Sequence, residues 1–123
     1  MKGNPGWWLP ALAWAATIVW VSASPDARGV GWMTDLFFQA DKVIHAGVFG
    51  ILAVFVLLAT GRPALSVVLA SLFGAADELH QATVPGRNAD VFDWVADTIG
   101  ALVAVALVVY LTRRRSRSAQ RLQ

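Results

Sequence analysis

The chain contains no cysteine and few charged residues. Of its 123 residues, 57% are hydrophobic and only 15% are charged, whereas ordinary soluble domains carry about 25% charged residues. The absence of cysteine excludes disulfides, thiolate metal ligands and a cysteine nucleophile. The scarcity of charge indicates a chain that has a lipid bilayer as its solvent. Its length gives room for one compact domain.

Basic residues slightly outnumber acidic ones, with a net charge of +2, but half of them lie at one end of the chain. The last eleven positions hold five of the ten, namely Arg113, Arg114, Arg115, Arg117 and Arg121. A basic cluster that follows an apolar run is typical of a topology signal or of a contact with anionic lipid. No nucleic-acid-binding motif accompanies it, so we expect no nucleic-acid partner.

Four apolar stretches predict an all-α membrane four-helix bundle. A hydrocarbon core of ~30 Å needs about 20 helical residues, and the predicted spans cover residues 7–23, 43–60, 64–76 and 94–112. The third is short, so we expect its helix to continue through Gln81 and to end in a polar turn at the membrane edge. Gly100 and Ala104 form a small-xxx-small step that favours close helix packing. Residues 1–112 form the predicted four-span domain, and residues 113–123 a basic cytoplasmic tail.

The distribution of basic residues predicts the orientation. With four spans, seven Lys/Arg residues, including Lys2 and Arg62, lie on one side and three on the other, and all eight acidic residues fall on the side with fewer basic residues. The positive-inside rule then places both termini in the cytoplasm and positions such as Asp26 and Arg87 outside.

The first span has a second interpretation. Lys2, an apolar run and Ser22-Ala23-Ser24 resemble a cleavable signal peptide. Pro25 just after the cleavage position and the length of the run favour a retained anchor, which is the prediction we adopt. Cleavage would leave three spans and the same outer site.

The remaining polar residues gather at predicted helix ends on the outer side. A charged side chain at the centre of a membrane costs about 2.5–3.5 kcal/mol. Charged side chains within the bilayer therefore face other helices or a wet cavity. We therefore predict one polar site at the outer-leaflet end of the bundle. The predicted ligand-binding residues are Asp41, Lys42, His45, Asp77, Glu78, His80, Gln81, Arg87, Asp90, Asp93 and Asp97.

Helical spacing suggests which of these side chains cooperate. Asp41 lies above His45 at i, i+4, and Asp77 faces the same way as His80 and Gln81. His80, Asp77 and His45 are candidates for general acid–base catalysis. No serine or threonine nucleophile stands out beside them. The spacing matches no standard zinc motif, so we predict no metal and no cofactor.

A purely structural reading of the same residues stays open. Asp41 and Asp93 are placed to cap helix N-termini. The other charges can form an interhelical network that locks the bundle, in which Arg87 neutralises Asp90 or Glu78. Arg87 follows Pro85-Gly86, a turn that directs its guanidinium back toward the helix ends.

The order of these motifs resembles the VanZ-like family of small bacterial membrane proteins. The resemblance covers residues 41–104 and consists of Asp41-Lys42-x-x-His45, Asp77-Glu78-x-His80-Gln81 and Pro85-x-Arg87, followed by Asp90, Asp93 and Gly100. Asp97 stands where the family usually has an asparagine, which exchanges a neutral amide for a carboxyl group. The resemblance implies a cell-envelope setting, because the founding member is associated with teicoplanin resistance, but it supplies no reaction.

We therefore expect a bacterial cytoplasmic-membrane protein that recognises an envelope component at its outer face. Its ligand would be a lipid-linked precursor, a lipid headgroup or a glycopeptide antibiotic, and membrane lipids surround it. One alternative is an enzyme that acts on an envelope lipid by His/Asp acid–base or metal-assisted chemistry. Another is an assembly subunit of a different membrane protein.

Overall fold

The computed structural model of the chain describes residues 1–24 and 40–121. A short 3-10 helix, η1 (Pro5–Trp7), leads into four α-helices: α1 (Trp8–Ala23), α3 (Ala40–Thr60), α4 (Pro63–Gln81) and α5 (Val91–Arg121). The described residues form no strands. The all-α prediction is confirmed, and each helix contains or closely matches a predicted span. Asp26, which the predicted orientation places outside the cell, is not among the described residues.

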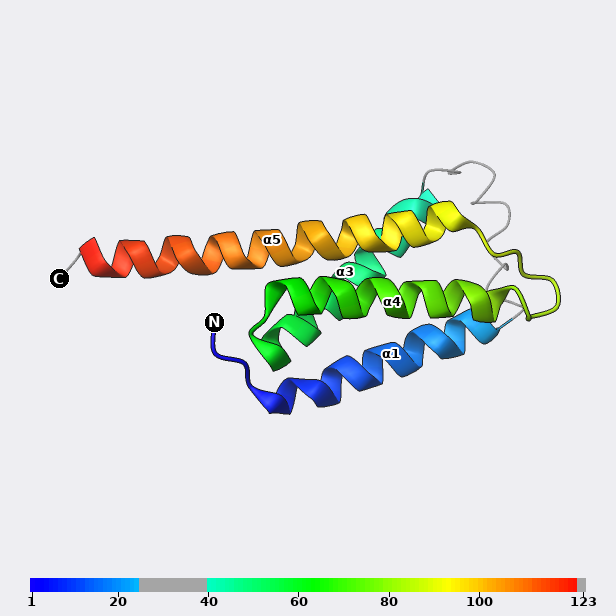
Figure 1. Cartoon of the computed structure of the whole chain (residues 1–123), viewed down its shortest axis with the longest axis horizontal. Coiled ribbons are helices and arrows are strands. Elements are labelled where there is room, and N and C mark those ends of the chain that lie inside the picture. The colour runs from blue at the N-terminus through cyan, green and yellow to red at the C-terminus, as the bar shows by residue number, and fades with distance from the viewer. Residues whose placement is uncertain (25–39, 122–123) are drawn as a thin grey trace.

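The four helices run alternately up and down (Figure 1). Helix α3 is the central element and packs against α1, α4 and α5. Its chain reverses into α4 at Gly61, whose φ of +66° is a left-handed conformation that favours glycine. Both chain termini and this turn lie at one end of the bundle, and the loop between α4 and α5 lies at the other.

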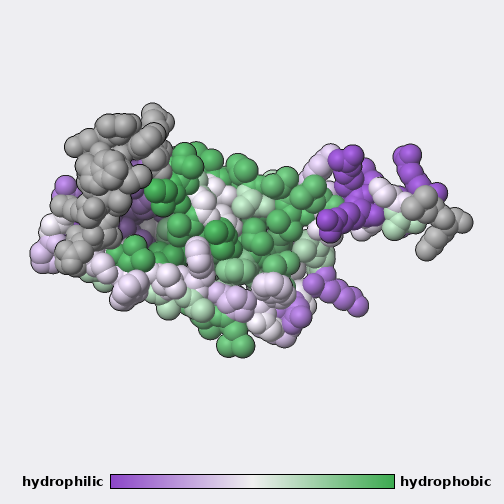
Figure 2. All heavy atoms as spheres, turned by 180° about the vertical axis from the view of Figure 1, so that it is seen from behind, coloured by the Kyte–Doolittle hydropathy of each residue, from purple (hydrophilic) through white to green (hydrophobic). Residues whose placement is uncertain are grey.

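The face of the bundle seen in Figure 2 is largely apolar along its middle. Large hydrophobic side chains such as Leu9, Leu72 and Val103 are more than half exposed. Within the described residues, three helices are long and apolar enough to cross a membrane, namely α1 together with η1, α3 and α5. Helix α4 is not among them, because its last two turns carry charged and polar groups. It nevertheless has 19 residues, about 28 Å of helix, and the predicted continuation through Gln81 is confirmed.

Helix α5 is longer than its predicted span. It continues from Val91 to Arg121 without a break, so the predicted boundary between residues 112 and 113 falls inside a helix. The basic residues after Thr112 extend away from the other helices (Figure 1). Because the helix starts at Val91, Asp93 and Asp97 occupy its first two turns.

Helices α3 and α5 approach each other through small residues. A Cβ atom added to Gly100 would lie 2.0 Å from the carbonyl oxygen of Ala46, and one added to Gly50 would lie 3.3 Å from the Cβ of Ala104. Small residues at a helix crossing let the two backbones come into contact, and this close packing stabilises the association of membrane helices. The predicted packing role of Gly100 and Ala104 is confirmed.

Candidate functional site

The polar residues of the sequence come together at the end of the bundle that holds the α4–α5 loop. We call this region the polar end. It comprises the last turns of α1 and α4, the first turns of α3 and α5, and the loop over residues 82–90. Antiparallel helices place these segments at one level, which is why residues distant in sequence meet there.

Lys42 joins the start of α3 to the start of α5. Its Nζ donates hydrogen bonds to Asp90 Oδ2, at 2.7 Å, and to Asp93 Oδ1. Asp90 also caps α5, because its Oδ1 accepts the backbone N–H of Phe92 at 2.9 Å. The hydrogen bond from Lys42 is the main cause that lowers the pKa of Asp90 below its ordinary value of 3.8.

His45 occupies the space between two carboxylates of α5. Its Nδ1 lies 2.9 Å from Asp97 Oδ1, and its Nε2 lies 3.7 Å from Asp93 Oδ2. Asp97 is 1% exposed and His45 is partly buried, so this contact between α3 and α5 is largely shielded from solvent. Asp41 is exposed, and one of its carboxylate oxygens lies within 4.8 Å of ligand atoms on His45 and Asp93.

Glu78 brings α4 into the same cluster. Its Oε2 accepts the backbone N–H of Asp90 at 2.9 Å, which ties the α4–α5 loop to α4. His45, Glu78 and Asp97 each offer one ligand atom, and these three atoms lie within 4.8 Å of one another. Three helices therefore contribute one side chain each to a small cluster in which Glu78 and Asp97 are buried and His45 is partly buried.

Asp77 pairs with Gln81, which was predicted to share its face of α4, and with Ser22 of α1, which was not predicted. Its Oδ2 accepts the hydroxyl of Ser22 at 2.7 Å and the amide of Gln81 at 3.2 Å, and all three residues are buried. Ser22 was not among the predicted site residues. The signal for it was a hydroxyl in the last turn of an apolar helix, at the level where the other helices carry their polar residues.

Arg87 binds backbone rather than a carboxylate. Its Nη2 donates to the carbonyl oxygens of Val21, at 2.9 Å, and Ser24, at 3.4 Å. The expected pairing with Asp90 or Glu78 is therefore wrong for the described residues, because Lys42 holds Asp90 and the backbone of Asp90 holds Glu78. The predicted return of the guanidinium to the helix ends is confirmed, since these carbonyls end α1.

His80 stands apart from the other candidates. Its Nδ1 is buried and has no hydrogen-bond partner among the described residues. Among the described residues it forms no hydrogen bond or ion pair with Asp77, although both lie in the last turns of α4. The side chains that converge are instead those of Asp77 and Gln81.

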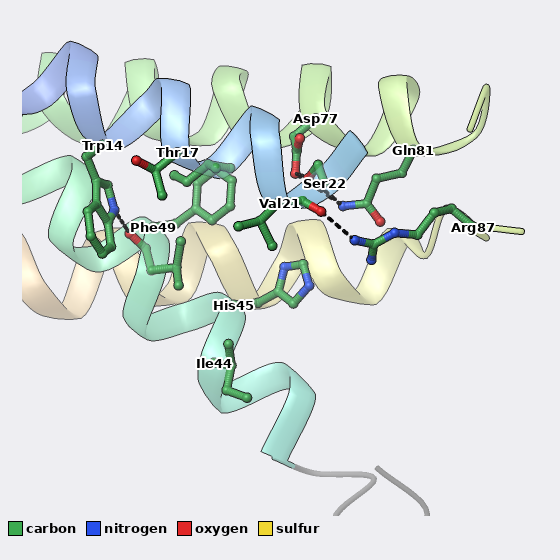
Figure 3. Close-up of a pocket in the computed structure, with 12 residues that line it drawn as sticks. Trp14, Thr17, Val21, Ser22, Ile44, His45, Phe49, Asp77, Gln81 and Arg87 are labelled. Carbon is green, nitrogen blue, oxygen red and sulfur yellow. Dashed lines mark hydrogen bonds between the residues drawn. The ribbon is translucent and has the colours of Figure 1, made fainter. Parts of the chain in front are cut away.

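A cavity of about 250 Å³ opens beside this network, between α1, α3 and α4. Figure 3 shows Asp77, Gln81 and Arg87 at one end of it and Trp14 and Phe49 at the other. His45 also lines the cavity. The wall of the cavity is thus polar on one side and apolar on the other.

Five buried side-chain atoms have no hydrogen-bond partner in the part of the chain that the structure describes. All of them belong to the polar end: Asp77 Oδ1, Glu78 Oε1, His80 Nδ1, Arg87 Nε and Asp97 Oδ2. A buried polar group without a partner costs about 1–3 kcal/mol, and more if it is charged. Such groups in one place call for a physical explanation, such as a bound water, ion or ligand.

Fold and site together define an all-helical membrane protein whose buried polar cluster adjoins a cavity. A family model described as VanZ/LLP1 matches residues 7–113, so the chain belongs to the VanZ/LLP1 family, and the resemblance seen in the sequence is confirmed. Comparison with curated proteins gives no match, and neither does comparison with solved structures.

Proposed function

We propose that this VanZ-family protein binds an amphiphilic component of the cell envelope in the cavity between α1, α3 and α4. The observation that carries the proposal is the composition of the cavity wall. Trp14, Ile18 and Phe49 provide an apolar surface, while Asp77 and Arg87 provide charged groups beside it. A ligand with an apolar chain and a polar head suits such a wall.

The polar wall indicates what the head contains. Asp77 Oδ1 is buried without a partner among the described residues, and a ligand hydroxyl or amine would donate to it. Arg87 keeps its Nε without a partner in the described structure, and a guanidinium binds phosphate or carboxylate groups. A head that carries both a donor and an anion fits both residues, as in a lipid-linked envelope precursor, a zwitterionic lipid headgroup or a glycopeptide of the teicoplanin type.

The proposal includes the orientation of the protein in the cytoplasmic membrane. We place the polar end at the outer leaflet and both termini in the cytoplasm, because seven of the ten basic residues then lie inside. Single cysteines introduced at Asn88 and Ser118 test this with a membrane-impermeant thiol reagent on intact cells. We expect labelling of Asn88→Cys only. Labelling of Ser118→Cys from outside would overturn the orientation.

Native mass spectrometry of the protein extracted with its lipids tests the binding function. We expect the wild type to retain an envelope lipid or precursor that Asp77→Asn loses. Asp41→Asn is the matched control, because Asp41 is an exposed carboxylate that does not line the cavity. It should retain the ligand. Equal retention by all three proteins would contradict the proposal.

Glycopeptide susceptibility tests the cellular consequence. Cells that express the wild type should tolerate more teicoplanin than cells that express Asp77→Asn at the same membrane level. Folded Asp77→Asn protein that gives full protection would exclude the cavity from this role.

A further inference from the structure

His45, Glu78 and Asp97 carry the chemistry of a metal site on three different helices. We propose that they bind one divalent cation, Zn²⁺ or Mn²⁺, and thereby join α3, α4 and α5. Their ligand atoms lie within 4.8 Å of one another. Atoms that share a cation at metal–ligand distances of about 2.0–2.2 Å are at most about 4.4 Å apart, so a small shift of the side chains would bring all three onto one ion.

Two buried oxygens point independently to a missing partner in this cluster. Asp97 is 1% exposed and Glu78 is 7% exposed. Each keeps one buried carboxylate oxygen, Oδ2 and Oε1 respectively, without a hydrogen-bond partner among the described residues. A carboxylate buried to this degree is normally paired or bound to a metal.

The neighbouring protein cations are already used elsewhere. Lys42 donates to Asp90 and Asp93, and Arg87 donates to backbone carbonyls at the end of α1. Asp97 pairs with His45, and Glu78 accepts the backbone N–H of Asp90, so neither carboxylate has a lysine or arginine partner among the described residues. A bound dication would neutralise both carboxylates at once.

Gly74 shows that the side chain of Asp97 reaches toward α4. A Cβ added to Gly74 would lie 3.0 Å from Asp97 Oδ2. Glu78 follows Gly74 by four residues, so it projects from the same face of α4 one turn further on. The oxygen without a partner therefore lies on the side of Asp97 that faces the helix bearing Glu78.

The donor set indicates which cation fits. One imidazole and two carboxylates suit Zn²⁺ and Mn²⁺, whereas Mg²⁺ and Ca²⁺ prefer oxygen ligands alone. Three protein ligands leave coordination positions open for water or for a ligand group. The absence of cysteine excludes thiolates from this set.

Asp41, His45 and Asp93 form a second group, whose ligand atoms also lie within 4.8 Å of one another. This outer group shares His45 with the first, inner group. We assign the ion to the inner group for two reasons. Asp41 is exposed to solvent, and Asp93 already accepts a hydrogen bond from Lys42. The two groups make different predictions for Asp41→Asn.

Isothermal titration of the full, tag-free chain in detergent with Zn²⁺ and with Mn²⁺ tests the site without any envelope ligand. The result is therefore independent of the proposed binding function. We expect saturable binding of one ion, together with a higher melting temperature. Glu78→Gln and Asp97→Asn should weaken binding about 100-fold or more, since loss of an outer-shell partner alone costs about 10–100-fold.

Asp41→Asn and His80→Gln are the controls, and both should bind within about threefold of the wild type. If Asp97→Asn does not fold, Glu78→Gln still tests the proposal. Its amide oxygen can keep the hydrogen bond from the Asp90 N–H, so this variant should fold. The proposal is overturned if neither metal binds saturably, or if binding survives in folded Glu78→Gln. Loss of binding in Asp41→Asn alone would place the ion in the outer group and equally overturn it.

Discussion

The two halves of the bundle hold their helices together in different ways. In the half that contains the α3–α4 turn, which we call the packed half, α3 and α5 meet through small residues and buried apolar side chains such as Leu57, Ala101 and Val105. At the polar end, the same helices meet through Lys42, His45 and their carboxylate partners.

The two halves also differ in how completely their polar groups are satisfied. In the packed half, buried Ser66 donates to the carbonyl oxygen of Arg62 and lies 3.3 Å from the hydroxyl of Thr60. The chain before η1 is tied to α3 by the bond from Asn4 N–H to the carbonyl oxygen of Leu58. All five buried side-chain atoms without partners in the described residues lie instead at the polar end. Among the described residues, the buried polar side chains of the packed half have partners, whereas those of the polar end include atoms that have none.

Gly100→Ala should have the largest effect, because it forces α3 and α5 apart where their backbones touch, one residue beyond His45 on α3. The added Cβ would lie 2.0 Å from the backbone of Ala46, and overpacking costs about 1–3 kcal/mol or more when backbone must move. We expect a loss of about 3 kcal/mol in the free energy of unfolding, measured by denaturation in detergent.

Gly47→Ala is the matched control for Gly100→Ala. It is the same substitution on α3, and a Cβ there meets nothing within 4 Å. It should be neutral or stabilise the protein by up to about 1 kcal/mol through helix propensity. Equal destabilisation by both variants would refute the close approach of α3 and α5.

Arg87→Ala should have a smaller effect, since it unties the α4–α5 loop from α1 without disturbing the helix packing. It removes the donor to Val21 and Ser24, a charge-assisted contact worth about 1–2 kcal/mol when partly exposed. Thermal melts should show this loss. Arg62→Ala, an exposed arginine in the α3–α4 turn, should change stability by less than about 0.5 kcal/mol.

Ser66→Ala and Asp77→Asn compare one buried polar group from each half. Ser66 has its partners, so its removal should cost about 1 kcal/mol. Asp77 is buried, and one of its oxygens has no partner among the described residues. An amide keeps an acceptor for Ser22 without the charge, so stability should be unchanged or higher. A large loss of stability in Asp77→Asn would mean that the polar end is a structural lock and would end the distinction drawn between the halves.

The smallest expected effect concerns Asp90, whose contribution to the stability of the fold should be lost in acid. Its pKa is lowered in the folded protein, mainly by the hydrogen bond from Lys42. The stabilisation is therefore present above the ordinary value of 3.8 and is lost as the pH falls through the lower, folded value. The wild type should be more stable than Asp90→Asn at neutral pH, and the difference should shrink below pH 4, as followed by melts across a pH series. A constant difference would show that Asp90 acts only as the cap of α5.

The sequence by itself determined the helices and the end of each one that is polar. Apolar runs and Gly61-Arg62-Pro63 fixed four helices and a tight reversal, because helix formation and turns depend on neighbours along the chain. Spacing within one helix also predicted that Asp77 and Gln81 would share a face, which their hydrogen bond confirms.

Only the tertiary structure decided the partners across helices. Ser22 joins Asp77, Arg87 binds the end of α1, and His45, Glu78 and Asp97 converge because Gly100 lets α5 touch α3. Helical periodicity gives the face on which a residue lies, but the rotation and separation of two helices depend on packing that no local pattern records.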